Sequence, residues 1–151
     1  MTSPQETRIL AVSSPGSRWA ELNAIVRAIG STSTTFVCTG TAKDKPIPDS
    51  HRLSDFSLFS LWKLPIFATQ LFWLVLRTRP QLVISTGAAP GVVAMVIGRL
   101  FGARCVWVES LTSTETISLS GRIAGRLANL WLTQWPDLAS DNGPQFRGGL
   151  I

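Results

Sequence analysis

Short apolar runs alternate with longer amphipathic stretches along most of the chain. The short runs are bounded by turn residues and predict strands over residues 8–12, 34–39, 82–85, 104–108 and 129–133. The stretches between them place apolar residues at helical spacing and predict helices over residues 19–29, 56–77, 91–101 and 123–127. Strands that alternate with helices are typical of a parallel sheet covered on both faces. The fold class expected is therefore α/β, with a doubly wound, Rossmann-like parallel sheet.

The length of the chain indicates a single domain over residues 1–151. A chain of 151 residues has the usual size of one domain. We expect residues 1–7 to form a loose tail and residues 40–54 and 110–120 to form polar loops. The first residues, MTSPQETR, contain no apolar h-region. No signal peptide is therefore expected, and the chain should begin in the cytosol.

The most apolar segment covers residues 56–77, with the sequence FSLFSLWKLPIFATQLFWLVLR. A run of about 20 apolar residues can span a bilayer, but Lys63 and Pro65 interrupt this one. We expect a partly buried helix whose outer side contacts a membrane. A membrane-spanning helix and a purely internal core helix are the alternatives.

Helical spacing divides the apolar residues of this segment between two faces. The face expected to pack on the sheet contains Leu64, Phe67, Leu71, Leu74 and Val75. The other face keeps Trp62, Ile66 and Trp73, and Lys63 can extend its ammonium group toward lipid headgroups. These four residues are therefore predicted to associate with a membrane.

The net charge of +5 comes from one part of the chain. Residues 51–104 contain six Arg or Lys residues and one acidic residue, Asp55, whereas the remainder is balanced. The same part is the most apolar, and this combination favours an anionic membrane surface as a partner. Nucleic-acid-binding surfaces usually carry denser clusters of Lys and Arg. Nucleic acid is therefore not an expected partner.

The cysteines and the single histidine suggest no metal or nucleophilic site. Cys38 and Cys105 each lie in a predicted buried strand, where we expect free core thiols. The chain has no CxxC motif and no Cys/His cluster, so no metal site is expected. His51 lies in a polar loop without an identifiable partner, which argues against a Ser-His-Asp or Cys-His centre. No cofactor is predicted.

The turn after the first predicted strand is a candidate phosphate-binding site. Residues 13–17, SSPGS, would expose backbone N–H groups at a helix N-terminus, a favourable place for an anion. Ser14 and Gly16 are the residues expected to contact the ligand. The turn lacks the GxGxxG pattern of dinucleotide sites. An ordinary turn with Ser17 as helix cap is the alternative.

The turn over residues 85–91, STGAAPG, has the same position with more favourable chemistry. Thr86 and Gly87 are small enough for a ligand to approach the backbone. Pro90 suits the first helical position, so the helix would direct its positive end at the turn. Such turns lie at the carboxyl ends of parallel strands, where these sheets bind ligands. A purely structural turn is the alternative.

Glu109 follows the apolar strand VWV and is the candidate catalytic residue. A carboxylate at this edge could accept a hydrogen bond from a sugar hydroxyl or act as a general base. The next residue, Ser110, is expected to help shape the same pocket. The alternative is that Glu109 caps the Ser/Thr-rich loop that follows.

Several stretches, RPQLVISTGAAPGVVAMVIGRLFGARCVWVES, LSGRIAG and ANLWLTQWPDLA, give the chain a family resemblance. The chain resembles the asparagine-linked glycosylation fourteen family, which includes bacterial PssD-type proteins of exopolysaccharide synthesis. It is more distantly similar to the N-terminal half of MurG. The matching features include Gly87, Glu109 and Ser110. The first turn departs from the family's Ser-Gly-Gly-His pattern, because only Gly16 matches and the histidine is absent.

The resemblance implies the N-terminal half of a GT-B glycosyltransferase, working as one subunit of a two-part UDP-sugar transferase. The implied donor is UDP-N-acetylglucosamine or a related UDP-sugar. The implied partners are a small catalytic subunit that binds the UDP-sugar, a sugar acceptor linked to polyprenyl or dolichyl pyrophosphate, and a membrane surface. This chain would bind the acceptor at the cytoplasmic face of a membrane and recruit the catalytic subunit. It would be inactive alone.

Two other classes of function stay open at this stage. One is a stand-alone Rossmann nucleotide-binding protein, which would require binding of a dinucleotide despite the missing fingerprint. The other is a non-catalytic interaction protein, a paralogue that has lost the acceptor turn. The donor sugar, the linkage and the lipid carrier are not readable from the residues.

Overall fold

A computed structural model describes residues 7–13, 17–29, 34–39, 50–53, 61–86, 88–109, 117 and 119–147. Its strands form one seven-stranded sheet in the order β3-β2-β1-β4-β5-β6-β7, and every neighbouring pair is parallel. The strands are β1 (Ile9–Ser13), β2 (Thr34–Thr39), β3 (Ser50–Leu53), β4 (Leu82–Ser85), β5 (Arg104–Val108), β6 (Leu130–Thr133) and β7 (Gln145–Phe146).

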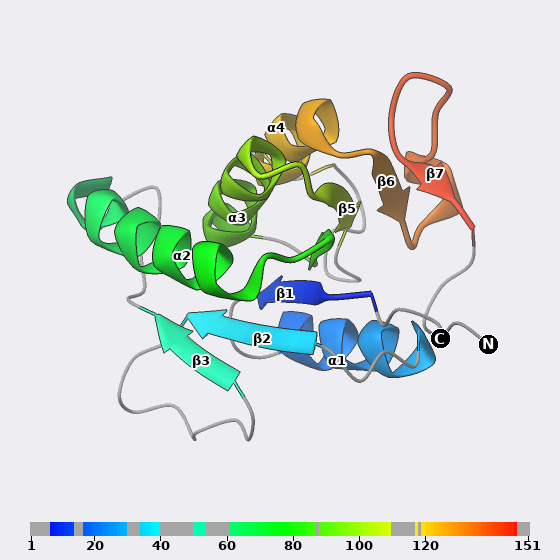
Figure 1. Ribbon diagram of the computed structural model, residues 1–151. Coiled ribbons are helices and arrows are strands. Elements are labelled where there is room, and N and C mark those ends of the chain that lie inside the picture. Colours follow the sequence, from blue (N-terminus) through cyan, green and yellow to red (C-terminus); the bar gives the residue numbers. More distant parts are fainter. Residues whose placement is uncertain are drawn as a thin grey trace.

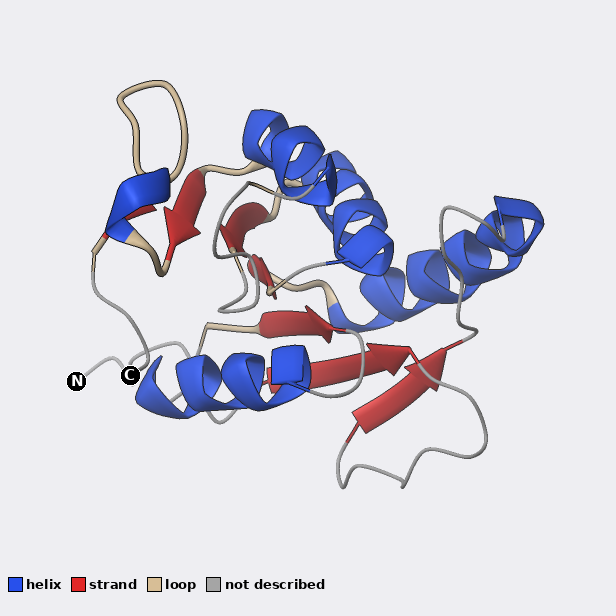
Figure 2. Cartoon of the chain, turned by 180° about the vertical axis from the view of Figure 1, so that it is seen from behind, coloured by secondary structure: helices blue, strands red, loops and turns tan. Residues whose placement is uncertain are grey.

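The helices cover the two faces of the sheet unequally (Figures 1 and 2). Helix α1 (Ser17–Ile29) packs on one face, and α2 (Leu64–Thr78), α3 (Ala88–Leu100) and α4 (Leu119–Leu127) form a layer on the other. Two short 3₁₀ helices, η1 (Leu61–Lys63) and η2 (Pro136–Leu138), complete the described elements. Helices on both faces of a parallel sheet confirm the predicted doubly wound α/β fold.

The larger core lies between the sheet and the three-helix layer. Phe67, Leu71 and Val75 of α2 are fully buried there, and Leu64 and Leu74 pack against the same cluster. This confirms the predicted sheet-facing side of the apolar segment. The smaller core joins α1 to the opposite face through Leu22 and Val26.

Three predicted strands, over residues 34–39, 82–85 and 104–108, have the observed bounds, and two others are displaced by one residue at one or both ends. Two strands were not predicted. β3 lies inside the expected loop over residues 40–54, and β7 lies in the polar C-terminal part. Neither segment has a long apolar run that would predict a strand. Each is a strand through parallel pairing with one neighbour, β3 with β2 and β7 with β6. Edge strands of this kind carry a weak local signal.

The observed helix bounds differ from the predicted ones. Helices α1, α3 and α4 begin earlier than predicted, and α2 is shorter than the predicted segment. Helix α4 begins at Leu119 rather than residue 123, and α3 begins at Ala88, so Pro90 is its third residue rather than its first. A proline is tolerated there because the first turn of a helix has N–H groups without intrahelical acceptors. Pro65 likewise lies in the first turn of α2 and does not interrupt it. Residues 56–60 of the predicted segment 56–77 lie outside the described residues.

Candidate functional site

Buried polar side chains gather at the carboxyl edge of the sheet. They come from the ends of β1, β4, β5 and β6 and from α1, which packs beside them: Ser13, Ser85, Thr86, Glu109, Thr133, Gln134 and Glu21. Each is at most 6% exposed. Because burying a polar group without a partner is costly, a cluster of this kind requires a hydrogen-bonded network. This edge is also where parallel sheets bind their ligands.

Strands β1 and β4 meet at the point where the strand order reverses. Across this point the Ser13 and Thr86 hydroxyl oxygens are 3.3 Å apart, and the Thr86 hydroxyl donates to the main-chain oxygen of Arg18 at 2.9 Å. Thr86 therefore ties the first turn of α1 to the end of β4. The Nε atom of Arg18 is buried and has no hydrogen-bond partner in the described part of the chain.

Glu109 is 1% exposed and lies one residue beyond β5. Its Oε1 atom accepts a hydrogen bond from Trp107 Nε1 at 3.0 Å. Its main-chain N–H donates to Leu132 O at 2.8 Å, which continues the pairing of β5 with β6. The side chain is thus held by the strand that precedes it, and the main chain is held by the neighbouring strand β6.

A second buried carboxylate adjoins Glu109. The Nε2 atom of Gln134 donates to Glu109 O at 3.1 Å and lies 3.2 Å from Glu21 Oε2. These contacts join α1, β5 and the end of β6 into one network. Sequence reasoning did not select Arg18, Glu21 or Gln134 as site residues. No local signal marks Glu21, since an acidic residue in an amphipathic helix is usually solvated.

The glycine at the start of α3 serves packing. A Cβ atom added at Gly91 would collide with the Ser85 side chain and would lie 3.1 Å from the Trp107 ring. Gly91 therefore lets α3 approach the ends of β4 and β5 closely. The small residues of this turn have at least this structural use beside any contact with a ligand.

Four of the predicted acceptor-binding residues, Ser14, Gly16, Gly87 and Ser110, lie outside the described residues. Thr86 is described and is fully buried. The structure brings Thr86 to the β1–β4 junction and Glu109 to the neighbouring strand end, on the same edge of the sheet. Their roles toward a ligand stay predictions.

Cys105 is a free, buried thiol, as expected for a core residue. Burial raises its pKa from 9.0 to about 11, against a smaller opposite effect of Arg99. The side chains of Cys38 and His51 lie outside the description, although His51 belongs to β3 and not to a loop. Among the described residues, no group of three His, Cys, Asp or Glu side chains could hold a metal ion.

The outer side of α2 is apolar and exposed. Trp62, Ile66 and Trp73 are 72%, 50% and 60% exposed, which confirms that they face away from the sheet. The ammonium nitrogen of Lys63 lies 5.2 Å from the centre of the Trp62 ring, a cation–π geometry. Among the described residues, no helix is both long enough and apolar enough to cross a membrane.

Exposed apolar residues also occur on α3 and α4. We define the outer helical surface by its exposed apolar residues on this layer: Trp62, Ile66, Phe72, Trp73, Val96, Leu100, Phe101, Leu119 and Ile123. The rings of Phe72 and Phe101 pack 5.4 Å apart and connect α2 to the end of α3. The sequences of the three helices contain no Asp or Glu. Sequence reasoning found only the α2 part, although the absence of acids from residues 56–108 was a usable signal.

Residues 22–150 match the family model described as "Oligosaccharide biosynthesis protein Alg14 like". The chain belongs to the Alg14 family. Similar proteins are named UDP-N-acetylglucosamine transferase subunit ALG14. The one from Eremothecium gossypii is 41% identical over 70 residues, covering 42% of this chain and 31% of that protein. One from Cryptococcus neoformans is 35% identical over 98 residues, covering 58% and 42%. The matches thus span less than half of these Alg14 relatives.

Solved structures with a fold similar to that of this Alg14 domain include a MurG protein and a UDP-N-acetylglucosamine 2-epimerase. MurG from Acinetobacter baumannii superposes with a TM-score of 0.70 at 12% identity, over 95% of this chain and 46% of that one. UDP-N-acetylglucosamine 2-epimerase from Rickettsia bellii superposes with a TM-score of 0.68 at 10% identity, over 96% and 45%. At this identity the likeness concerns the fold. It confirms the predicted half of a GT-B architecture.

Proposed function

We propose that this chain is the acceptor-binding and membrane-anchoring subunit of a two-chain UDP-sugar transferase. The donor would be UDP-N-acetylglucosamine or a related UDP-sugar, and the acceptor a sugar on a polyprenyl or dolichyl pyrophosphate. One observation carries the proposal: the Alg14 match over residues 22–150 coincides with a domain that has the fold of somewhat less than half of MurG. The similar proteins are named as transferase subunits, which supports a second chain for the UDP-sugar.

The acceptor would bind at the carboxyl edge of the sheet. Helices α1 and α3 both begin there, and their positive ends favour the pyrophosphate. Arg18, whose buried Nε atom has no hydrogen-bond partner among the described residues, adds a cation at the first turn of α1. Ser14, Gly16 and Gly87 belong to the turns that precede these helices.

Glu109 would contact or deprotonate the acceptor hydroxyl, and Thr86 and Ser110 would shape the pocket beside it. Support comes from its fixed position, because Trp107 Nε1 and the β5–β6 pairing hold the residue in place. A pre-positioned carboxylate is what general-base catalysis requires. Since Glu109 is 1% exposed, the acceptor hydroxyl must reach it past the segments that border this edge.

The outer helical surface would rest on the cytoplasmic face of a membrane. Large exposed apolar patches mark interaction surfaces, and Trp and basic residues favour the interface of an anionic bilayer. Trp62, Ile66 and Trp73 would enter the interface, with Lys63 near the headgroups. The association would be peripheral, along the length of α2.

The test is reconstitution of sugar transfer. This chain is co-expressed with a small UDP-sugar-binding partner from the same source, and transfer of radiolabelled N-acetylglucosamine to a lipid-linked acceptor is measured. We expect transfer by the pair and none by either chain alone. Robust transfer by the purified single chain would refute the subunit role. Binding of NAD or NADP by calorimetry, with an inactive pair, would favour the stand-alone nucleotide-binding alternative.

A further inference from the structure

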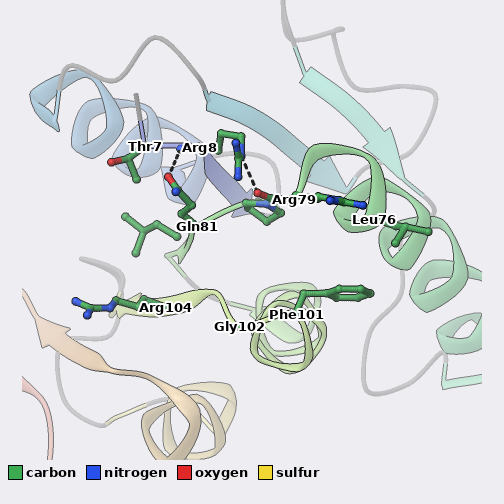
Figure 3. A pocket seen from close by; sticks show the side chains of 10 residues that line it. Thr7, Arg8, Leu76, Arg79, Gln81, Phe101, Gly102 and Arg104 are labelled. Carbon is green, nitrogen blue, oxygen red and sulfur yellow. Dashed lines mark hydrogen bonds between the residues drawn. The ribbon is translucent and has the colours of Figure 1, made fainter. Parts of the chain in front are cut away.

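A second polar region lies at the amino edge of the same sheet, opposite to Glu109. A cavity of about 890 Å³ opens there, between the beginnings of β1, β4 and β5 and the ends of α2 and α3. Three arginines line it, Arg8, Arg79 and Arg104, and none of the described residues that line it is acidic. Figure 3 shows these arginines and Gln81 around the opening, with Leu76 and Phe101 on one side. We call this region the amino-edge cleft.

The helix ends at the amino-edge cleft are capped mainly by backbone groups. Arg79, in the left-handed conformation at φ 45°, caps α2 through its N–H to Val75 O. The end of α3 is closed in the same way by the N–H groups of residues 101–103. Arginines near helix ends often serve to cap carbonyl groups. In this cleft that use is confined to one bond, from Arg8 Nε to Arg79 O at 2.8 Å.

The guanidinium groups are consequently available to a ligand. Among the described residues, the Arg79 and Arg104 side chains make no hydrogen bond or ion pair, and Arg8 makes only the bond from Nε. The forked N–H groups of arginine match phosphate oxygens. The charge and donor geometry of the amino-edge cleft therefore suit a phosphate ester.

One wall of the amino-edge cleft is apolar and joins the outer helical surface. Phe101 lines the cleft and packs against Phe72 of α2 at 5.4 Å between ring centres. Leu100, which precedes Phe101 in the chain, is 76% exposed. A ligand with a phosphate among the arginines could thus extend an apolar part over Leu76 and Phe101. An anionic phospholipid has this combination of groups, and a free phosphate does not.

We propose that the amino-edge cleft binds the headgroup of an anionic phospholipid. This contact lies at the opposite edge of the sheet from the acceptor site, and it would fix the orientation of the domain on the bilayer. It rests on the membrane contact proposed above and not on the sugar-transfer reaction.

The test compares two paired variants that each remove two positive charges. Arg79→Gln with Arg104→Gln alters the cleft, and neither side chain makes a hydrogen bond or ion pair within the described part of the chain. Arg27→Gln with Arg147→Gln is the matched control, since both residues are exposed and neither lines the cleft. Equal unfolding temperatures by circular dichroism establish that the variants are folded. Binding is then measured by co-sedimentation with phosphatidylcholine vesicles, with and without phosphatidylglycerol.

We expect the cleft variant to bind the anionic vesicles roughly tenfold or more weakly than wild type, since each basic residue at a membrane surface contributes about 1 kcal/mol. The control variant should lose much less. Equal losses in the two variants, or no loss in either, would overturn the proposal. If the wild-type protein itself does not bind anionic vesicles, the membrane contact proposed above is refuted as well. If it binds and the cleft variant is unchanged, only the cleft proposal falls.

Soluble probes separate a lipid site from a phosphate site. Dihexanoyl phosphatidic acid, kept below its micelle concentration, and inorganic phosphate are titrated into wild type and the cleft variant by calorimetry. The short-chain lipid should bind wild type, bind the cleft variant more weakly, and exceed inorganic phosphate in affinity. Equal affinity for the two probes would identify a phosphate site and refute the lipid assignment. No binding of the short-chain lipid would refute it too.

Discussion

The charged groups at the two edges of this sheet differ in burial and in hydrogen bonding. At the carboxyl edge, Glu21 and Glu109 are buried and take part in a hydrogen-bonded network with Trp107 and Gln134. At the amino edge, the arginines of the amino-edge cleft are exposed, and two of them make no described side-chain bond. A buried, partnered group has a fixed position and can act on a bound substrate. An exposed, unpartnered cation can accept a ligand from outside with little rearrangement.

The largest expected effect is a loss of sugar transfer when one of the two buried carboxylates of the carboxyl edge, Glu109, is replaced. Glu109→Gln keeps the size of the side chain and an oxygen that can accept from Trp107 Nε1, but it removes the base. We expect sugar transfer by the reconstituted pair to fall about 10²-fold or more, the usual contribution of a general base. The measurement is initial-rate transfer at saturating UDP-sugar.

Glu21→Gln is the matched control for this prediction. Its new amide oxygen can still accept from Gln134 Nε2, so transfer should fall far less. Equal losses in the two variants would mean that the network acts only as structure. Unchanged transfer in Glu109→Gln would remove the catalytic role and favour the non-catalytic paralogue.

A smaller effect is expected from a comparison of two tryptophans that lie side by side on neighbouring strands. Trp107 and Trp131 are register partners in β5 and β6. Trp107 Nε1 donates to Glu109, whereas Trp131 Nε1 is buried without a partner in the described structure. Trp107→Phe should lower the free energy of unfolding by about 1–3 kcal/mol beyond Trp131→Phe, because only the first leaves a buried acceptor without its donor. Urea unfolding followed by circular dichroism measures the difference, and equal losses would contradict it.

The smallest effect concerns Cys105, which lies near the amino end of β5 but inside the core. Its folded pKa of about 11 exceeds the value of 9.0 expected when unfolded. The unfolded chain therefore loses this proton first, and the contribution of this thiol to stability should be constant well below pH 9 and decline as the pH rises from 9 to 11. Cys105→Ala should flatten this decline in unfolding experiments at pH 8, 9 and 10. A decline of the same size in the variant would assign it to other groups.

Local patterns predicted the central part of the fold well. Residues 82–85 and 104–108 are mostly apolar runs, and residues 34–39 have an apolar centre between threonines; central parallel strands favour apolar residues because both of their faces are covered. The burial of Phe67, Leu71 and Val75 followed from helical spacing alone. β3 and β7 were not predicted, because they are strands through pairing with a neighbour and not through their own composition.

The candidate site was predicted only in outline. Glu109 was selected because an acid directly after an apolar strand must lie at the carboxyl edge. The more distant members of its network could not be selected in this way, because Gln134 and Glu21, which contact each other, are 113 residues apart in the chain. Thr86 and Ser13 similarly meet across 73 residues. A hydrogen bond depends on positions within a fraction of an ångström, and only the assembled sheet sets them.

The sequence by itself determined which segments are strands or helices in the centre of the sheet, the outward side of α2 and the family of the chain, because periodicity, apolar content and motifs are local properties. Tertiary structure decided what each edge of the sheet contains. Parallel register places Arg104 beside Leu82, and Leu82 beside Ile9, so three separate segments bring their arginines to one cleft. The same register carries Ser13, Thr86 and Glu109 to the opposite edge. Strand direction, which no single segment encodes, separates the two.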